Sequence, residues 1–560
     1  MTDRAVHILP DGMSPVTFGG CFGWFHQARA SGLQHVGVLI CPGVSQDFSN
    51  AYRTFRLMAV RLAEEGYPVL RFDYPGTGDS SDAISQNLWE EWLASIHAAA
   101  GWLREEAGVT RLLLIGLRIG ATLAASAVAR RSDVAGLVLI EPWLHGRSYV
   151  SQFVTEARLR IKRSSGEDKN GGDCGTLEVG ELLFSQESLD AMRAANLAQL
   201  PMPVDLQAAV FSSAKPEAVA SRLALWHQSC ASLFCGELAG LDAMLRPSQH
   251  TDEPDADLSA LVDWLTRAVP PQVASRSSLL VRSVGALNLP GCVEEVLRFG
   301  EGRRLTGILC RPNGVKGQGF AVIICNSGGN PRHGFARFGV ELARRLAEAG
   351  IASLRMDFAG LGDSAHLMDG VEAQTHVFDV DRARDVGDAI DALEEHGYRR
   401  FAIHGLCSGA YHAVHVARAE PRISVVLAVN LPWFSLRHER PGPDSIAQQC
   451  VGALQARHVG TLLIFGDGDP GLKQIERHFG PGGVSLQAFS EVSVAVLAGL
   501  DHELSVRWMR RIVADHILWF LQHQCNHCLK GVTQSGYTRH DFGLYGNNRT
   551  ATEEDARAAE

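Results

Sequence analysis

The sequence has 560 residues, which exceeds the size at which a single hydrophobic core keeps growing, so at least two domains are expected. The net charge is −10, which argues against a nucleic-acid partner held through phosphate neutralisation. No apolar run reaches the roughly 18 residues that cross a bilayer. The first residues lack the apolar core of a signal peptide, so we expect a cytoplasmic protein without a membrane span.

The chain contains an internal repeat. The segment RLAEEGYPVLRFDYPGTGDSS at 61–81 aligns without gaps with RLAEAGIASLRMDFAGLGDSA at 345–365, and 12 of the 21 positions are identical. An apolar run precedes each copy, and a short glycine-containing motif follows each copy some 40 residues later. A repeat of this kind indicates a duplicated domain.

Taken in chain order, each half alternates strands with helices. The first half runs from an apolar segment at 16–25 through 111–117 to 135–143. The second half predicts a strand pair at 292–299 and 303–312, strands at 319–327, 351–358, 399–406, 423–433 and 458–469, and helices at 334–350 and 379–397. Strands separated by helices of this length imply a mostly parallel sheet covered on both faces, so the predicted fold class is α/β.

These patterns predict one domain at 1–272 and a second at 279–524. The predicted linker lies around 270–278, and the sequence after it ends in a tail at 525–560 that we expect to be disordered. The first half carries a long, partly polar segment at 145–205 that the second half lacks. Such a segment predicts a lid over the carboxyl ends of the strands.

One motif, Gly-x-x-x-Gly at a predicted strand-to-helix turn, occurs once in each half. IHGLCSGAYH at 403–412 has Cys407 at its centre, and LIGLRIGATL at 114–123 has Arg118 there. The first of these resembles the nucleophile elbow of the α/β-hydrolase fold, in which small neighbours relieve crowding around a strained nucleophile. A helix that begins beneath Cys407 would favour its thiolate.

The residues that follow Cys407 occur in the order nucleophile, acid, base, which is the order of this fold. Asp469 lies just after a predicted strand, with Asp467 as the alternative acid, and His502 precedes the last predicted helix. In that arrangement His502 takes the thiol proton while Asp469 orients the imidazole. A chance combination of a buried cysteine, a turn aspartate and a surface histidine is the alternative interpretation.

An oxyanion hole would complete such a site. We expect the backbone amide of Ser408 to donate to the oxyanion, together with Ser327 or Gly328 in the loop NSGGNPRHG. His333 in the same loop is expected to cap the next helix or to face the substrate, not to act as the base.

The first half is predicted to be inactive in acyl chemistry, because Arg118 stays protonated and cannot accept an acyl group. Arg118 either binds an anion at the helix N-terminus or pairs with a neighbouring carboxylate, and the second is favoured. Asp73, Asp357 and the tripeptides GDS at 78–80 and 362–364 recur in both halves. Their recurrence in an active and an inactive copy indicates turn structure and not chemistry.

Within the α/β-hydrolases, the two halves resemble the two hydrolases found with bacterial exosortase A systems, fused in one chain. The segment 328–364 and the elbow GLC are similar to one of them, and GLRIGA with 178–197 is similar to the other. A cysteine at the elbow is also similar to dienelactone hydrolases, polyhydroxyalkanoate synthases and tetramate-forming Dieckmann cyclases. The resemblance implies acyl chemistry through a thioester.

The leading hypothesis is therefore an enzyme that transfers an acyl group from a thioester or ester through Cys407, as a thioesterase or acyltransferase without a cofactor. We expect the acyl substrate to be carried on coenzyme A or an acyl carrier protein, although the resemblance does not settle the substrate. The alternatives are a Dieckmann-type or lactonising cyclase and a non-catalytic ligand- or carrier-binding protein. Cys525 and Cys528 form a single CxxC without a second pair, so no metal site is expected.

Overall fold

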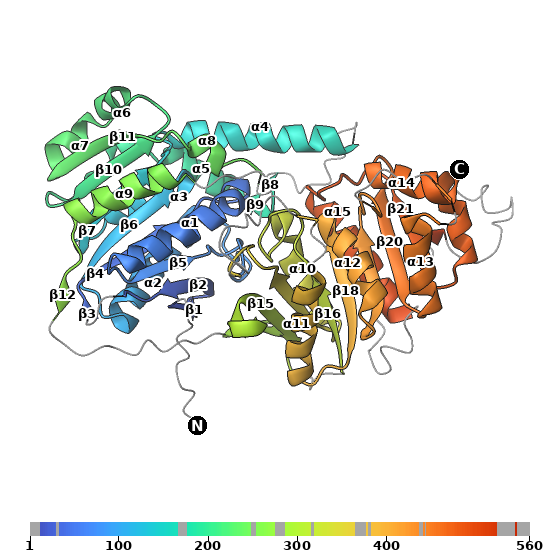
Figure 1. Cartoon of the computed structure of the whole chain (residues 1–560). Coiled ribbons are helices and arrows are strands. Elements are labelled where there is room, and N and C mark those ends of the chain that lie inside the picture. Colours follow the sequence, from blue (N-terminus) through green and yellow to red (C-terminus); the bar gives the residue numbers. More distant parts are fainter. Residues whose placement is uncertain are drawn as a thin grey trace.

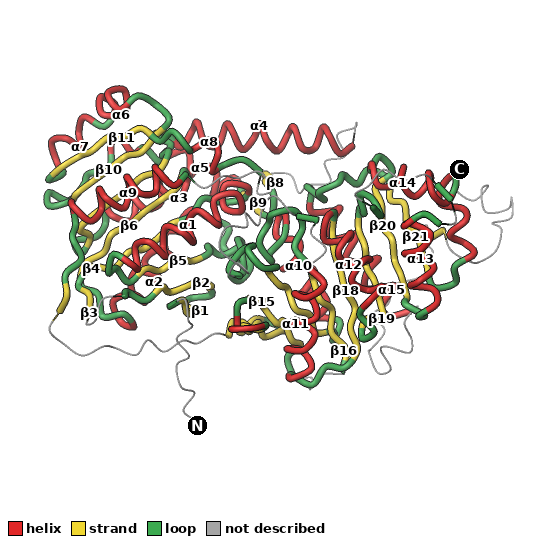
Figure 2. Tube along the Cα trace, in the orientation of Figure 1, coloured by secondary structure: helices red, strands yellow, loops and turns green. Residues whose placement is uncertain are grey.

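The computed structural model describes residues 12–29, 33–165, 176–247, 254–274, 286–314, 319–364, 377–378, 382–435, 441–442, 444–523 and 544–545. Each half of the chain forms its own central sheet with helices packed around it (Figure 1). Loops gather where the two halves meet (Figure 2). None of the helices in the described ranges combines the length and hydropathy needed to cross a bilayer.

The first sheet has eight strands in the order β1-β2-β5-β4-β6-β7-β10-β11. From β5 to β11 in this order, adjacent strands are parallel to each other, whereas β1 and β2 pair antiparallel. Its strands are β1 (Met13–Phe18), β2 (Cys21–His26), β4 (Val36–Cys41), β5 (Val69–Phe72), β6 (Arg111–Leu117), β7 (Val134–Ile140), β10 (Gln207–Ser212) and β11 (Ser232–Glu237). The surrounding helices are α1 (Gln46–Glu64), α2 (Leu88–Glu106), α3 (Ile119–Val128), α6 (Pro216–Arg222), α7 (Ala224–Ser229), α8 (Leu241–Met244) and α9 (Asp255–Ala268).

The second sheet repeats this order with added edge strands, as β13-β14-β15-β17-β16-β18-β19-β20-β21-β22. Its strands are β13 (Ala286–Leu289), β14 (Cys292–Phe299), β15 (Leu305–Pro312), β16 (Phe320–Ile324), β17 (Ala352–Asp357), β18 (Arg400–Leu406), β19 (Ile423–Val429), β20 (Gly460–Gly466), β21 (Val492–Leu497) and β22 (Leu544–Tyr545). The helices are α10 (Phe338–Glu348), α11 (Arg382–Glu395), α12 (Ser408–Ala419), α13 (Ile446–Ala456), α14 (Pro470–Phe479) and α15 (Arg507–His523), with 3₁₀ turns η2 (Glu301–Arg303), η3 (Phe335–Arg337) and η4 (Pro481–Ala488).

Both sheets are buried on both faces, which explains why their parallel strands are continuously apolar. In β4, Val38 packs into the cluster on one face and Leu39 into the cluster on the other. In β16, Val322 and Ile323 divide between two clusters in the same way. The predicted α/β fold with mostly parallel sheets in two bodies is confirmed.

Two residues of the predicted linker pair with a strand of the first half. A two-residue strand, β12 (Val273–Ala274), pairs antiparallel with β3 (Leu33–Gln34), so residues 273–274 belong to the first body. Of the predicted tail, the structure describes β22, which pairs antiparallel with β21. The rest of 525–560 lies outside the described residues.

The insertion of the first half contains α4 (Gly146–Ser165), β8 (Leu177–Val179), β9 (Leu182–Phe184), α5 (Gln186–Ala194) and the 3₁₀ turn η1 (Leu197–Gln199). Figure 1 shows α4 extending from the first half along one side of the molecule, with the β8–β9 hairpin between the halves. Glu178 Oε1 accepts a hydrogen bond from the backbone N–H of Arg507 at 2.5 Å, and Gly180 O accepts one from Arg510 at 3.1 Å. The insertion thus contacts the start of α15 in the second half.

Candidate active site

Cys407 lies in a strained turn between β18 and α12. Its φ of 55° and ψ of −118° are unusual for a residue with a side chain, and Arg118 adopts nearly the same values, 50° and −111°, between β6 and α3. Both copies of the motif therefore keep the elbow backbone. The turn projects the residue at its centre away from the sheet, at the N-terminus of the next helix.

The glycines of the elbow are required by close packing of backbone on backbone. A Cβ on Gly405 would lie 2.0 Å from the carbonyl carbon of Gly409, and one on Gly409 would lie 2.5 Å from Asn326 O. The first copy has the same constraint, because a Cβ on Gly120 would lie 2.1 Å from Pro42 O. These contacts press the start of the helix against the loop that follows the central strand.

The structure brings Cys407, His502 and Asp469 together at the carboxyl ends of the strands. His502 Nδ1 lies 2.6 Å from Asp469 Oδ2, and the Cys407 thiol is near enough to the imidazole to contribute to its raised pKa. The Asp469 side chain is fully buried and the His502 side chain is 35% exposed. The hydrogen bonds to Asp469 and then to Cys407 raise the pKa of His502 to about 10, which favours the imidazolium at neutral pH.

The two aspartates of the turn after β20 have different partners. Asp469 caps α14, because its Oδ1 accepts from the Gly471 N–H at 2.7 Å, and this leaves Oδ2 for His502. Asp467 is exposed, and its Oδ1 accepts from the Gly499 N–H at 3.1 Å. The capping role fixes the Asp469 carboxylate, so this residue and not Asp467 faces the imidazole.

Asn430 is a further residue of the site that the sequence patterns did not reveal. It directly follows β19 with a φ of 48°, and it is fully buried. Its amide donates to Asp501 O at 3.1 Å and His502 O at 3.0 Å, while its Oδ1 accepts from the Gly466 N–H at 3.1 Å. Asn430 thereby ties the loop of the histidine to the strand that ends before Asp469. A polar residue at the end of an otherwise apolar strand is the signal that could have found it.

The residues expected to form the oxyanion hole, Ser408 and the loop residues Ser327 and Gly328, lie next to one another. Ser408 begins α12, so its N–H is one of the amides that have no partner within the helix. The Gly328 N–H donates to Ser408 Oγ at 2.8 Å, which occupies that amide. Of the two loop residues expected to donate, Ser327 is therefore the one whose N–H has no acceptor within the described ranges.

The carbonyl of His333 accepts a hydrogen bond from the Gly339 N–H at the start of α10 at 3.0 Å, whereas its side chain packs against the first half. It is buried against α1 of the first half, where its ring centroid lies 5.2 Å from that of Phe48 and 5.8 Å from that of Tyr52. Its Nε2 lies 3.2 Å from Ser49 Oγ. Burial lowers the pKa of His333 to about 4, so the ring is neutral and packs as an apolar group between the halves.

The corresponding positions of the first half carry cations. Arg118 Nη1 lies 3.1 Å from Asp47 Oδ1, so the residue pairs with a neighbouring carboxylate. Lys215 directly precedes the proline that begins α6, as Asp469 precedes the proline that begins α14. Burial raises the pKa of Asp47 to about 6, although Arg118 opposes that shift. The segment before α9 at 248–253, where a base would lie, falls outside the described residues.

The recurrent aspartates build turns, as predicted. Asp73 Oδ2 accepts from the Asp79 N–H at 2.8 Å, and its carbonyl accepts from the hydroxyl of Ser80. Asp357 makes the same two contacts in the second half, with the amide and the hydroxyl of the aligned GDS residues. The carboxylates of the GDS aspartates, however, contact arginines of the opposite half, and that of Asp363 also contacts Arg332 of its own half. Cys525 and Cys528 lie outside the described residues.

Comparison with known proteins finds similarity to hydrolases. A thermostable monoacylglycerol lipase from Bacillus sp. is 28% identical over 105 residues, which are 19% of this chain and 40% of the lipase, so the chain matches well under half of that relative. Solved structures with similarity include a lidless α/β serine hydrolase from Xanthomonas campestris (16% identity, 47% of this chain and 96% of that chain, TM-score 0.30). An esterase from Pyrococcus furiosus is 14% identical (46% of this chain and 90% of that chain, TM-score 0.33). Residues 37–190 match the family model described as the α/β hydrolase fold.

Proposed function

We propose that the second half is an acyl-transfer enzyme of the α/β-hydrolase fold that works through Cys407, His502 and Asp469. The observation that carries this proposal is the position of His502, whose Nδ1 lies 2.6 Å from the buried carboxylate of Asp469 and whose pKa is raised by Asp469 and by the elbow cysteine, Cys407. A raised imidazole pKa stabilises the thiolate, which is the nucleophilic form of cysteine.

In the proposed reaction the Cys407 sulfur attacks the acyl carbonyl carbon, and the bond from that carbon to the leaving sulfur or oxygen breaks. The proton held by His502 passes to the leaving group. An acceptor then attacks the acyl-thioester carbon, gives its proton to His502 and releases Cys407. The N–H groups of Ser408 and Ser327 stabilise the oxyanion in both steps, and Asp469 holds the ring in the orientation for both proton transfers.

The proposed substrate is an acyl thioester or ester, carried on coenzyme A or an acyl carrier protein. The match to a monoacylglycerol lipase supports ester-type chemistry. A cysteine nucleophile favours thioesters over oxyesters, because a thiolate adds poorly to an ester with an alkoxide leaving group.

The test is the intact mass of the protein after incubation with acetyl, octanoyl and palmitoyl thioesters of coenzyme A and of N-acetylcysteamine. We expect an acyl adduct that maps to Cys407 and is absent from C407A and much slower to form in H502A. C230A, which removes a half-buried thiol of the first half, is the matched control and should retain the adduct. A wild-type protein that never acquires an acyl group contradicts the proposal and favours a non-catalytic binding protein.

The mass of the released product separates the reactions that share this intermediate. Hydrolysis adds water to the acyl group, and transfer adds the acceptor. Attack by a carbon or hydroxyl within the same acyl chain, as in a cyclase, adds neither.

A further inference from the structure

The two GDS turns join the halves through a pair of reciprocal ion pairs. Arg71 and Arg355 occupy aligned positions of the repeat, as do Asp79 and Asp363. Arg71 Nη2 lies 2.8 Å from Asp363 Oδ1, and Arg355 Nη2 lies 3.1 Å from Asp79 Oδ1. Each copy therefore gives its arginine to the aspartate of the other copy, as in the self-complementary interface of a two-fold dimer. All four side chains are at most 7% exposed.

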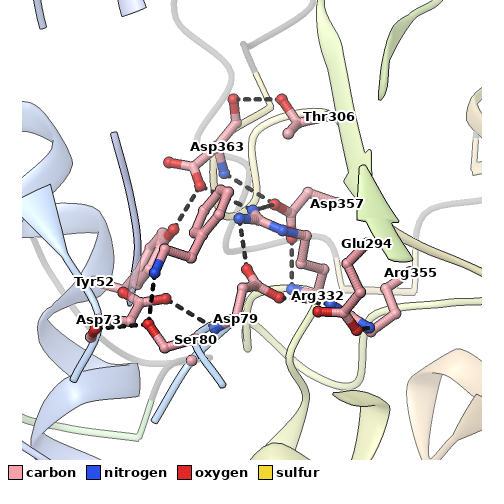
Figure 3. Close-up of polar contacts among 12 residues, drawn as sticks. Tyr52, Asp73, Asp79, Ser80, Glu294, Thr306, Arg332, Arg355, Asp357 and Asp363 are labelled. Carbon is pink, nitrogen blue, oxygen red and sulfur yellow. Dashed lines mark hydrogen bonds and ion pairs between the residues drawn. The ribbon is translucent and has the colours of Figure 1, made fainter. Parts of the chain in front are cut away.

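Arg332 breaks this symmetry. The register of the repeat, continued towards the N-terminus, places Phe48 opposite Arg332, so the first half has no such cation. The Arg332 guanidinium lies 2.7 Å from Asp79, 2.7 Å from Asp357 and 2.8 Å from Asp363, and its side chain is 0% exposed (Figure 3). One buried cation of the second half is thus held by two carboxylates of its own half and by one from the first half.

Arg332 belongs to the loop that carries the candidate oxyanion donor. The loop begins after β16 with Asn326, whose amide donates to Asp357 Oδ1 at 3.1 Å and to Asn330 O at 2.9 Å. It ends at Arg332, whose backbone N–H donates to Asp357 Oδ1 at 2.6 Å. Ser327 lies between these two anchors. The second anchor is completed by the carboxylate of Asp79, which comes from the other half of the chain.

We infer that Asp79 of the first half is a positioning residue for the oxyanion hole of the second half. This inference rests on the proposed function. Asp79 binds the guanidinium of Arg332 on the side that Asp357 and Asp363 leave open. This contact holds the loop so that the Ser327 N–H is directed at the reacting carbonyl. The half without a nucleophile therefore supplies a part of the site in the half that has one.

The test compares acyl transfer with alkylation of the same thiol in the full chain. Alkylation of Cys407 by iodoacetamide needs the thiolate but creates no oxyanion, whereas turnover of octanoyl-N-acetylcysteamine needs both. For Asp79→Asn we expect kcat to fall about 10- to 100-fold, because a displaced donor stabilises the oxyanion less well. KM and the alkylation rate of Cys407 should stay unchanged.

Asp82→Asn is the matched control. Asp82 lies three residues further along the same turn and pairs with Arg337 and Arg344 across the halves, but not with Arg332. It should leave kcat unchanged. If Asp79→Asn does not fold, Asp79→Glu keeps the charge and displaces the guanidinium, and it should lower kcat without slowing alkylation.

Three results would overturn the inference: an unchanged kcat in a folded Asp79 variant, equal losses in the Asp79 and Asp82 variants, or a parallel loss of alkylation. A wild-type protein that does not turn over any thioester overturns the proposed function and this inference with it. Turnover by the wild type together with an unaffected Asp79 variant overturns this inference alone.

Discussion

The two halves share a strand order and an elbow backbone, yet they place opposite charges at the ends of the same strands. The second half has a thiol at the elbow and a buried carboxylate before the proline of α14, whereas the first half has Arg118 and Lys215 at those positions. The retained glycines show that the turn itself is a packing requirement, since backbone atoms approach closely whichever residue sits at its centre. The chemistry depends on a few side chains that can change without loss of the fold.

The comparison also shows what the first half retains. Its GDS turn and Arg71 keep the contacts that bind the other copy, although its own elbow has no nucleophile. Buried ion pairs contribute little net stability over apolar residues, but breaking one is costly because it leaves a charge without a partner. The interface therefore keeps the two halves in one arrangement.

The largest expected effect concerns the difference in acyl-transfer activity between the Cys407 elbow and the Arg118 elbow. In a C407A background, Arg118→Cys places a thiol on the same backbone, and acyl transfer should stay about 10⁴-fold or more below wild type. Lys215 at the acid position cannot orient a base, so the new thiol remains unassisted. The measurement is release of free thiol from an acyl thioester, with intact mass to detect an adduct. An acyl group on the cysteine introduced at position 118 would contradict the conclusion that the first half cannot assist a nucleophile at its elbow.

The second prediction concerns the carboxylate that faces His502. Asp469→Asn keeps the cap of α14 but removes the largest cause of the raised pKa, so the pKa of His502 should fall from about 10 towards 6.5, as read by NMR titration. We expect kcat to fall about 10³- to 10⁴-fold. Asp467→Asn is the control within the same turn and should leave both quantities unchanged.

The Asp469→Asn substitution should also change how the free energy of unfolding depends on pH. Because the folded pKa of His502 is raised, its pairing stabilises the fold fully below pH 6.5, and this contribution is lost as the pH rises through about 10. The difference in unfolding free energy between wild type and Asp469→Asn should therefore be larger at pH 6 than at pH 10.5. Urea denaturation at both pH values measures it, and a difference that grows with pH would contradict the assignment of His502 as the paired cation.

A fourth prediction compares the residues that directly follow the equivalent strands β19 and β7. Asn430→Ala releases the His502 loop and should lower kcat about tenfold, because the base is held less well. Glu141 follows β7 in the first half with a φ of 44°, as Asn430 follows β19, and it accepts from the Ser213 N–H at 2.7 Å. Glu141→Gln is thus the matched control and should not change kcat. Equal effects of both variants on kcat would show that Asn430 acts through general stability.

The smallest effect is expected at Arg118. Its pair with Asp47 is partly exposed, so Arg118→Ala should lower the unfolding free energy by about 1 kcal/mol at pH 7.5 and leave kcat unchanged. The pKa of Asp47 is about 6, and a protonated carboxyl attracts the guanidinium weakly, so the loss should be smaller at pH 4.5. Urea denaturation at the two pH values tests this. A change in kcat would show that the first elbow takes part in the reaction.

The repeat and the order of Cys407, Asp469 and His502 could be read from the sequence, because both follow from local patterns. Apolar runs of strand length and helical periodicity predicted the α/β fold, and the glycine spacing predicted the elbow. The choice between Asp469 and Asp467 needed the structure, since it depends on which carboxylate caps a helix and which oxygen is left over. Asn430 was missed for a related reason, because its partners lie in the loop of His502 and at the end of β20.

The contacts between the halves were decided by tertiary structure alone. The aspartates of the GDS turns were predicted to serve their own turns, and their amides do so, but their carboxylates bind arginines some 250 to 300 positions away along the chain. His333 was expected to cap the next helix or to face a substrate, and no pattern in the sequence indicated that its ring packs on α1 of the other half. Local patterns report which face of an element is apolar, whereas the partner of a buried charge depends on how two finished sheets dock. Sequence therefore determined the two folds and the candidate residues of the site, and only the docking of the halves decided which carboxylates surround Arg332.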